Sequence, residues 1–372
     1  ILIRFEIMSR TVALTLKGDL GSTLKSLGAK SLYKCYQCGT CTAICPLSEE
    51  STVRTRRLIK YIQLGLQDKV LGDLTPWLCY YCGECSDNCP KEADPGEIMM
   101  AMRRYATQQL SWGKVGKIFY SKAAAAAAFI IFSIFAIAMM ALFHGEMNMA
   151  VVDIYSFIEY DLIHEVGLIA GVFIGLSALA NVVIMYSYAK KGTGASGSAG
   201  SWVSSFFRVL FKEVLAQMRF TKCENQNRYL AHMSLFWGFV GLFVATGIHY
   251  IGDIFGFEVD VIIPRALGVI AGILLMYGSI YFIVKRFERK ERYALESHFS
   301  DWLFLWLMFL TGLTGFLITV FLYANMPLVT YIMYALHLLF IFDLLITAPF
   351  TKFMHALYRP FALWFQEAWG LR

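Results

Sequence analysis

Eight cysteines in two identical runs are the residues best suited to carry chemistry. The runs are Cys35-x-x-Cys38-x-x-Cys41-x-x-x-Cys45-Pro46 and Cys79-x-x-Cys82-x-x-Cys85-x-x-x-Cys89-Pro90. Thiolates ligate iron–sulfur clusters, and this spacing is typical of chains that bind two [4Fe–4S] clusters, in which the fourth cysteine of one run ligates the other cluster. We therefore predict one cluster on Cys35, Cys38, Cys41 and Cys89, and a second on Cys79, Cys82, Cys85 and Cys45.

Two other uses of these cysteines fit the sequence less well. Disulfide frameworks are typical of oxidising compartments, whereas this basic N-terminal region has no evident cleavable signal peptide and indicates a reducing compartment. Zinc sites usually take two pairs of Cys or His ligands rather than a run of four closed by Cys-Pro. Iron–sulfur binding is therefore the favoured interpretation.

The segments around the runs indicate helices. Residues Ile1 to Leu16 are rich in β-formers and predict one or two short strands. After Ser51, a plausible helix N-cap, apolar residues recur at roughly helical spacing up to Leu66, and Gly96 to Gln109 again has a helical pattern. The two runs are thus joined by helix, as expected of an α-helical ferredoxin arrangement. Four cationic residues lie on the first of these helices: Arg54, Arg56, Arg57 and Lys60. They could form a solvated or lipid-facing surface, or a docking site for an acidic partner.

With these residues the sequence resembles a known family over about residues 30–110. The first run reads Cys-Tyr-Gln-Cys-Gly-Thr-Cys-Thr-Ala-Ile-Cys-Pro, and Trp77-Leu78 precedes the second run. This pattern is similar to the C subunit of heterodisulfide reductases. No two cysteines are adjacent, so the chain lacks the paired Cys-Cys motifs of that family's disulfide-reducing subunit.

The rest of the chain is too apolar for an ordinary soluble protein. Of 372 residues, 58% are hydrophobic and 16% are charged, and apolar stretches dominate after about Lys122. A membrane-spanning helix needs about 20 mostly apolar residues. Six stretches qualify: 123–143, 163–188, 230–250, 263–285, 302–324 and 328–351. We expect a mainly α protein, with a two-cluster ferredoxin-like domain over residues 1–113 fused to a six-helix transmembrane bundle over residues 114–372.

Positive charges indicate how this bundle is oriented. The segments 114–122, 189–229, 285–300 and 352–372 hold eighteen Lys and Arg, whereas 144–162, 251–262 and 325–327 hold none. Lys and Arg gather on the cytoplasmic side of a membrane. We therefore expect a multi-pass protein of the cytoplasmic (inner) membrane, with both termini and the clusters on the cytoplasmic side. Membrane topology also accounts for most of the net charge of +6, so no nucleic-acid binding is expected.

Histidines in the apolar part are candidate haem ligands, because ionisable residues in spanning helices are costly and imidazole is a common axial ligand. His337 and His355 are 18 residues apart, so one continuous helix would place them on the same face about 27 Å apart. His232 and His249 bracket the third helix. The helix directions predict the pairs His232/His355 and His249/His337. His164 and His298 are substitute ligands for these pairs. His144 and His298 are otherwise typical of histidines at the membrane interface.

A second resemblance covers the end of the chain. The stretch from His337 to His355 is similar to the haem-bearing helix of the membrane subunit of respiratory nitrate reductase, which binds two b haems and oxidises quinol. The fused design resembles the membrane C subunit of the quinone-interacting membrane-bound oxidoreductase family. That resemblance implies menaquinone as substrate, flavoprotein partners like heterodisulfide reductase A, membrane lipid contacts, and a link to adenylylsulfate reductase in sulfate respiration.

Asp343 lies inside the sixth stretch, six residues after His337. Its carboxylate could carry protons for quinone chemistry, or could be neutral and hydrogen-bonded to another helix. The favoured function is a quinone-linked oxidoreductase subunit that exchanges electrons between menaquinol and a soluble partner through two b haems and two [4Fe–4S] clusters. Two alternatives stay open: the anchor of a membrane heterodisulfide reductase, and a haem-free membrane-anchored iron–sulfur relay.

Overall fold

The computed structural model describes residues 16–49, 51–222, 225–256, 260 and 262–371. The fold is mainly helical, at 77%, with no strand among these residues. The strands expected over residues 1–16 lie almost wholly outside the described ranges. Within them, Leu16 forms an isolated antiparallel bridge with Leu66.

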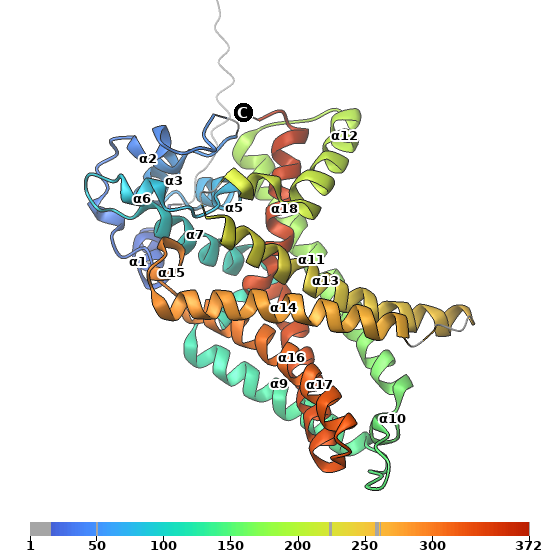
Figure 1. Ribbon diagram of the computed structural model, residues 1–372. Coiled ribbons are helices and arrows are strands. Elements are labelled where there is room, and N and C mark those ends of the chain that lie inside the picture. The colour runs from blue at the N-terminus through green and yellow to red at the C-terminus, as the bar shows by residue number, and fades with distance from the viewer. Residues whose placement is uncertain (1–15, 50, 223–224, 257–259, 261, 372) are drawn as a thin grey trace, which may run out of the picture.

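Short helices build the cysteine-rich part, at the upper left of Figure 1. They are α1 (Leu20–Ser26), η1 (Leu32–Lys34), α2 (Thr40–Ala43), α3 (Thr55–Gln63), α4 (Gln67–Leu71), α5 (Thr75–Leu78), α6 (Glu84–Asp87) and α7 (Pro95–Leu110). The helical linkage between the cysteine runs is present. The prediction that Ser51 is the N-cap of the next helix is wrong, because α3 begins at Thr55. The Ser51 hydroxyl instead donates to the Leu47 carbonyl. Asp94 caps α7 by accepting from the Glu97 N–H.

Six helices in the described ranges are long and apolar enough to cross a membrane. They are α9 (Lys122–Phe143), α11 (Tyr160–Thr193), α13 (Gln226–Phe255), α14 (Ile262–Glu288), α16 (Phe299–Tyr323) and α17 (Pro327–Thr347). All six expected spans are present, each within a few residues of its predicted bounds. Smaller elements connect them: η2 (Trp112–Lys114), α8 (Gly116–Phe119), α10 (Ile154–Phe157), α12 (Ala199–Val209), η3 (Leu210–Leu215), η4 (Met218–Lys222) and α15 (Arg292–Leu295).

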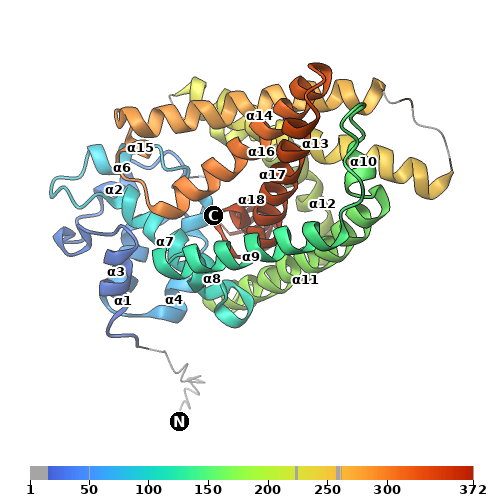
Figure 2. The same cartoon turned by 90° about the horizontal axis from the view of Figure 1, so that it is seen from below.

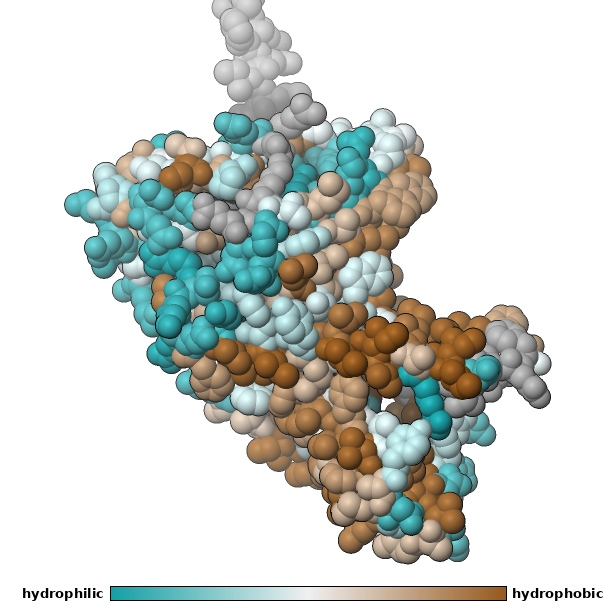
Figure 3. All heavy atoms as spheres, viewed as in Figure 1, coloured by the Kyte–Doolittle hydropathy of each residue, from teal (hydrophilic) through white to brown (hydrophobic). Residues whose placement is uncertain are grey.

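The long helices pack in a row. α13 packs on α14, α14 on α16, α16 on α17, and α17 on α9 and α11. Figure 2 shows α13 and α14 on one side of this row and α9 and α11 on the other. Apolar side chains dominate the surface of the long helices, whereas polar ones gather on the cysteine-rich part (Figure 3). This surface is the one expected of a membrane bundle that carries a water-exposed domain.

The sixth stretch is not one continuous helix, so the expectation that His337 and His355 share one helical face is wrong. α17 ends at Thr347, and it is followed by η5 (Ala348–Phe350), by extended backbone at Thr351 and by η6 (Lys352–Met354). Proline lacks a backbone N–H and disrupts a helix interior, so Pro349 accounts for the break. His355 opens a separate helix, α18 (His355–Ala368), so it does not share a helical face with His337.

α18 joins the two parts of the chain. Its side chains Tyr358, Leu363 and Phe365 belong to the same buried cluster as residues of α1, α3, α5 and α7. Residues of α11 enter this cluster too, at Val182 and Met185. Tyr358 packs on Trp77 with ring centroids 4.7 Å apart. The cysteine-rich part is therefore built around the C-terminal helix rather than attached by a loose linker.

A buried ion network reinforces this junction. Arg104 of α7 binds the Glu97 carboxylate at 2.5 Å and the Asp301 carboxylate of α16 at 3.0 Å, and Lys352 binds the other Asp301 oxygen at 2.6 Å. Burial opposes the charge of Arg104, but the two carboxylates outweigh it and raise the pKa of its guanidinium. The network thus ties the cysteine-rich part to the first turn of a membrane helix.

Arg104→Met is expected to lower the free energy of unfolding by about 3–5 kcal/mol, because two buried carboxylates lose a shared cation. Thermal unfolding followed by circular dichroism in detergent measures the change. Lys30→Met is the matched control, because Lys30 pairs with Glu296 across the same junction in an exposed position and should change little. Equal effects of the two substitutions would contradict a structural role for the buried network.

Candidate metal centres

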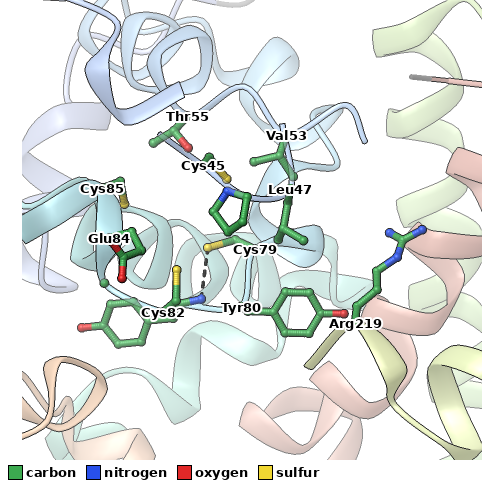
Figure 4. Close-up of a pocket in the computed structure, with 14 residues that line it drawn as sticks. Cys45, Leu47, Val53, Thr55, Cys79, Tyr80, Cys82, Glu84, Cys85 and Arg219 are labelled. Carbon is green, nitrogen blue, oxygen red and sulfur yellow. Dashed lines mark hydrogen bonds between the residues drawn. The ribbon is translucent and has the colours of Figure 1, made fainter. Parts of the chain in front are cut away.

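One pocket gathers four cysteines from both runs. It is lined by Cys79, Cys82 and Cys85 of the second run and by Cys45, the last cysteine of the first. Figure 4 shows their side chains around a common space. The Tyr81 N–H donates to the Cys79 sulfur at 3.3 Å, the dashed line in that view. These are the four residues expected to share the second cluster. We call this space the inner pocket.

A second pocket gathers the other four cysteines, Cys35, Cys38, Cys41 and Cys89. Cys38 is exposed, so this pocket opens on the surface. The Ala93 N–H donates to the Cys89 sulfur at 3.3 Å, and the Cys38 sulfur lies 3.3 Å from the Thr40 hydroxyl. The Thr40 side chain is the main reason that the pKa of Cys38 is lowered. We call this space the outer pocket.

The two cysteine runs repeat one backbone conformation. Gln37 and Tyr81 occupy the same place in their runs and both have positive φ, 68° and 56°. Gly39 and Gly83 follow two residues later with φ of 97° and 105°. Such backbone is unfavourable for a residue with a side chain, so its recurrence at equivalent positions shows that the two runs fold alike. A short helix then carries the third cysteine of each run.

The donor set fits an iron–sulfur cluster better than a single ion. Among the described residues, no three His, Cys, Asp or Glu side chains converge on one metal ion. A tetrahedral zinc site would need four sulfurs each about 2.3 Å from one centre. Burial raises the pKa of the Cys41 and Cys45 thiols to about 11, and a bound metal would favour the thiolate form of both.

His232 and His355 lie beside each other, at the start of α13 and of α18. Their ring centroids are 6.4 Å apart and their planes cross at 71°. Metal–imidazole bonds of about 2 Å on both sides of one ion would place two opposed ring centres about 6 Å apart. This is the pair expected on the cytoplasmic side, and its spacing fits a bis-histidine haem.

Hydrogen bonds orient both rings for ligation. His232 Nδ1 lies 2.8 Å from the Gln217 amide oxygen, and His355 Nδ1 lies 2.6 Å from the Lys352 carbonyl. Both partner oxygens only accept, so each Nδ1 carries the proton and Nε2 keeps the lone pair. Burial lowers the pKa of His355 to about 4, which keeps its imidazole neutral. A neutral ring whose second nitrogen donates to an oxygen is the usual form of a metal-ligating histidine.

The second expected pair is described only in part. The His337 ring is oriented by a hydrogen bond at Nδ1, as the rings of the first pair are. Its Nδ1 lies 2.9 Å from the Thr314 hydroxyl. Because that hydroxyl donates its proton to the Leu310 carbonyl, its oxygen accepts from His337. A Cβ at Gly315 would come within 3.1 Å of the His337 ring, so that glycine makes room for the imidazole. His249 belongs to α13, and its side chain lies outside what the structure describes.

The other three histidines of the apolar part differ from one another in their contacts. His298 is the N-cap of α16, and its Nδ1 lies 2.8 Å from the Ser300 hydroxyl and 3.3 Å from the Ser300 N–H, so the ring is engaged in capping that helix. His144 is exposed at the end of α9. His164 donates from Nδ1 to the Tyr160 carbonyl and stacks on Tyr250, the neighbour of His249 in sequence. His164 thus lies near the part of α13 that carries His249.

Asp343 is buried between α17 and α9. Its Oδ2 accepts from the Ser133 hydroxyl at 3.1 Å, which is the interhelical bond that the sequence left as one alternative. Its Oδ1 is buried and has no hydrogen-bond partner among the described residues. One oxygen is therefore available to a further donor, which keeps the proton-carrying role open.

Aromatic side chains connect the inner pocket to the histidine pair. Tyr80, between Cys79 and Cys82, contacts Phe220 edge-on with centroids 5.4 Å apart. Phe220 stacks on His232 at the same centroid distance. Sequence reasoning missed Phe220 and Gln217, because no local pattern marks a residue that contacts side chains from other helices.

The basic patch on α3 divides in two. Arg54 donates to the Ser48 and Ser51 carbonyls, and Arg57 pairs with Asp73, so both hold their own domain together. Arg56 and Lys60 are exposed, and Arg56 lines the outer pocket. Lys91 lines it as well, 5.5 Å from the ring centre of exposed Tyr36. The rim of the outer pocket is thus cationic and aromatic.

Comparisons with known proteins agree with the cysteine geometry. Residues 31–93 match the family described as a 4Fe-4S dicluster domain. The chain is 36% identical over 101 residues to a protein of Archaeoglobus profundus that is named as like the C subunit of heterodisulfide reductase, covering 27% of this chain and 54% of that one. It is 49% identical over 39 residues to an iron–sulfur C subunit of the CoB–CoM heterodisulfide reductase of Methanocaldococcus jannaschii, covering 10% and 21%.

A third relative is the C subunit of the H2:CoB–CoM heterodisulfide, ferredoxin reductase of Methanothermobacter marburgensis, 38% identical over 50 residues, which cover 13% of this chain and 27% of the relative. The chain thus spans about half the length of the first relative and about a quarter or less of the other two. The matches support an iron–sulfur domain like that of the heterodisulfide reductase C subunits. Within the described ranges, the chain also has six helices long and apolar enough to span a membrane.

Proposed function

We propose that this chain is a membrane electron relay that exchanges electrons between a quinone in the bilayer and a soluble redox partner. The observation that carries the proposal is the His232/His355 pair, set for ligation and linked through Phe220 to the inner cysteine pocket. We also propose the division into a cluster-bearing unit, residues 1–113, and a membrane unit, residues 114–372. Both termini would lie on the cytoplasmic side.

Bound clusters and haems would supply one-electron transfer between these sites. The residues of the chain hold and orient them. The four cysteines of each pocket would bind one cluster, His232 and His355 one b haem, and His337 with His249 or His164 the other. Asp343, whose Oδ1 has no partner within the described part of the chain, would accept or release the proton that accompanies quinone chemistry.

The outer pocket is the favoured contact for the soluble partner. An exposed cluster shortens the distance to a docked protein, and Cys38 is exposed there. The cationic rim formed by Arg56, Lys60 and Lys91 would attract an acidic surface. By resemblance, the partner is a flavoprotein like heterodisulfide reductase A, which would connect menaquinol to adenylylsulfate reductase.

The second candidate is the anchor of a membrane heterodisulfide reductase. The relatives favour it, because their names refer to heterodisulfide reductase. Both candidates share the relay within this chain and differ only in the soluble partner.

The test is an optical spectrum of the purified chain, dithionite-reduced minus oxidised, with a pyridine haemochrome count and reduction by a menaquinol analogue. Two b haems per chain, reduced by the quinol, are the expected result. A chain that holds two clusters and no haem would overturn the quinone relay and leave a membrane-anchored iron–sulfur protein.

A further inference from the structure

Two arginines stand one helical turn from the two paired histidines. Arg228 precedes His232 by four residues on α13, and Arg359 follows His355 by four residues on α18. Side chains four apart lie on the same face of a helix. Each helix thus presents an imidazole and a guanidinium together, although the two helices are far apart in sequence.

Both guanidinium groups reach the same loop, Cys79–Cys82 of the inner pocket. Arg228 donates to the Tyr81 carbonyl at 2.9 Å and to the Tyr80 carbonyl at 3.0 Å. Arg359 donates to the Cys79 carbonyl at 3.4 Å, and its guanidinium carbon lies 3.7 Å from the centre of the Tyr80 ring. Three consecutive carbonyls of a cluster-binding loop are thus held from the histidine-bearing helices.

The loop that is held this way also sets the environment of the cysteines. Tyr81 has positive φ, and its N–H donates to the Cys79 sulfur. Hydrogen bonds to sulfur tune the reduction potential of a cluster. A shift of the loop would therefore change this bond together with the Tyr80–Phe220–His232 contacts.

The outer pocket has a neutral side chain at the corresponding place. The Cys35 carbonyl, equivalent to that of Cys79, accepts from the Gln63 amide at 2.9 Å. The Cys79 carbonyl also accepts from Arg103 of α7. Cations stabilise the reduced, more negative form of a cluster, so the arginines held against the inner loop favour the reduced state of the inner cluster.

We propose that Arg228 and Arg359 are positioning residues that fix the inner-pocket loop against the His232/His355 pair, which makes the cluster of Cys45, Cys79, Cys82 and Cys85 the one that exchanges electrons with the membrane. This inference rests on the proposed relay. It assigns the order of the sites: histidine pair, inner pocket, outer pocket, soluble partner.

The test compares two substitutions at each arginine in the full chain. Arg→Gln removes the charge and keeps one donor, whereas Arg→Lys keeps the charge and loses the planar fork that spans two carbonyls. Arg57→Gln is the control, because Arg57 binds Asp73 within its own domain. The measurements are the potentials of the two clusters by redox-poised electron paramagnetic resonance, and the rate of cluster reduction after quinol addition.

The Gln variants are expected to move only the inner cluster to a more negative potential, by a tenfold change in equilibrium constant, about 59 mV for one electron. The Lys variants should keep the potential and slow cluster reduction at least tenfold. Equal shifts of both clusters, or unchanged potentials and rates, would overturn the inference. Potentials can be titrated with dithionite even if the wild-type chain holds no haem, so failure of the relay and failure of the arginine assignment are distinguishable.

Discussion

Replacing His232 by alanine should reduce the haem content from two b haems per chain to one. The two rings are 6.4 Å apart and each keeps its Nε2 lone pair, so each would supply one axial ligand of the same haem. Loss of either imidazole removes half of the axial ligation, and His355→Ala should give the same result. The pyridine haemochrome count per chain and the reduced-minus-oxidised spectrum measure the change.

His144→Ala is the control, since that exposed ring lies at the end of α9 and should leave both haems in place. Quinol-dependent reduction of the clusters should fall with the haem count and persist in the control. A His232→Ala chain that keeps two haems would rule out the His232/His355 pairing. His337→Ala should also lose one haem, but a spectrally different one, because its ring bonds Thr314 on another helix.

Cys45→Ser should remove the cluster of the second cysteine run, although Cys45 belongs to the first. Cys45 lines the inner pocket with Cys79, Cys82 and Cys85, while Cys89 lines the outer pocket. Iron content should fall from about eight to about four atoms per chain, since each [4Fe–4S] cluster takes four thiolates. Iron analysis and the electron paramagnetic resonance spectrum of the dithionite-reduced protein provide the measurement.

Single substitutions in both runs test whether the fourth cysteine of each run ligates the cluster of the other run. The spectrum of Cys45→Ser should coincide with that of Cys82→Ser and differ from that of Cys38→Ser, and Cys89→Ser should behave like Cys38→Ser. If Cys45→Ser instead matched Cys38→Ser, each run would hold its own cluster and the crossed assignment would be wrong. The variants also assign each signal to a pocket.

Much of this architecture follows from local sequence alone. Cysteine spacing is a covalent property of the chain, and the Cys-Pro ending recurs in both runs, so the iron–sulfur interpretation needed no tertiary information. The six apolar stretches are similarly local, because the bilayer requires length and apolar composition from each helix by itself. The helices in the structure have the expected order and number, with ends that differ by a few residues from the expected bounds.

Local reasoning failed where Pro349 breaks the helix inside an apolar stretch that was counted as one span. A continuous helix would place His337 and His355 on the same face, but the break after Thr347 puts them on two different helices. The Pro349 carbonyl, freed near this break, accepts from Asn181 of α11 at 2.7 Å. This bond joins α11 to the segment after α17, and only the fold identifies the two partners.

The sequence by itself determined the candidate ligands, namely eight cysteines in two runs and histidines near the ends of apolar helices. The tertiary structure decided which of these groups meet. His232 and His355 approach because α13 and α18 converge on the inner pocket, and Arg228, Arg359 and Phe220 act only through that convergence. Contacts between residues more than a hundred positions apart depend on how the helices pack, and the periodicity of no single helix encodes them.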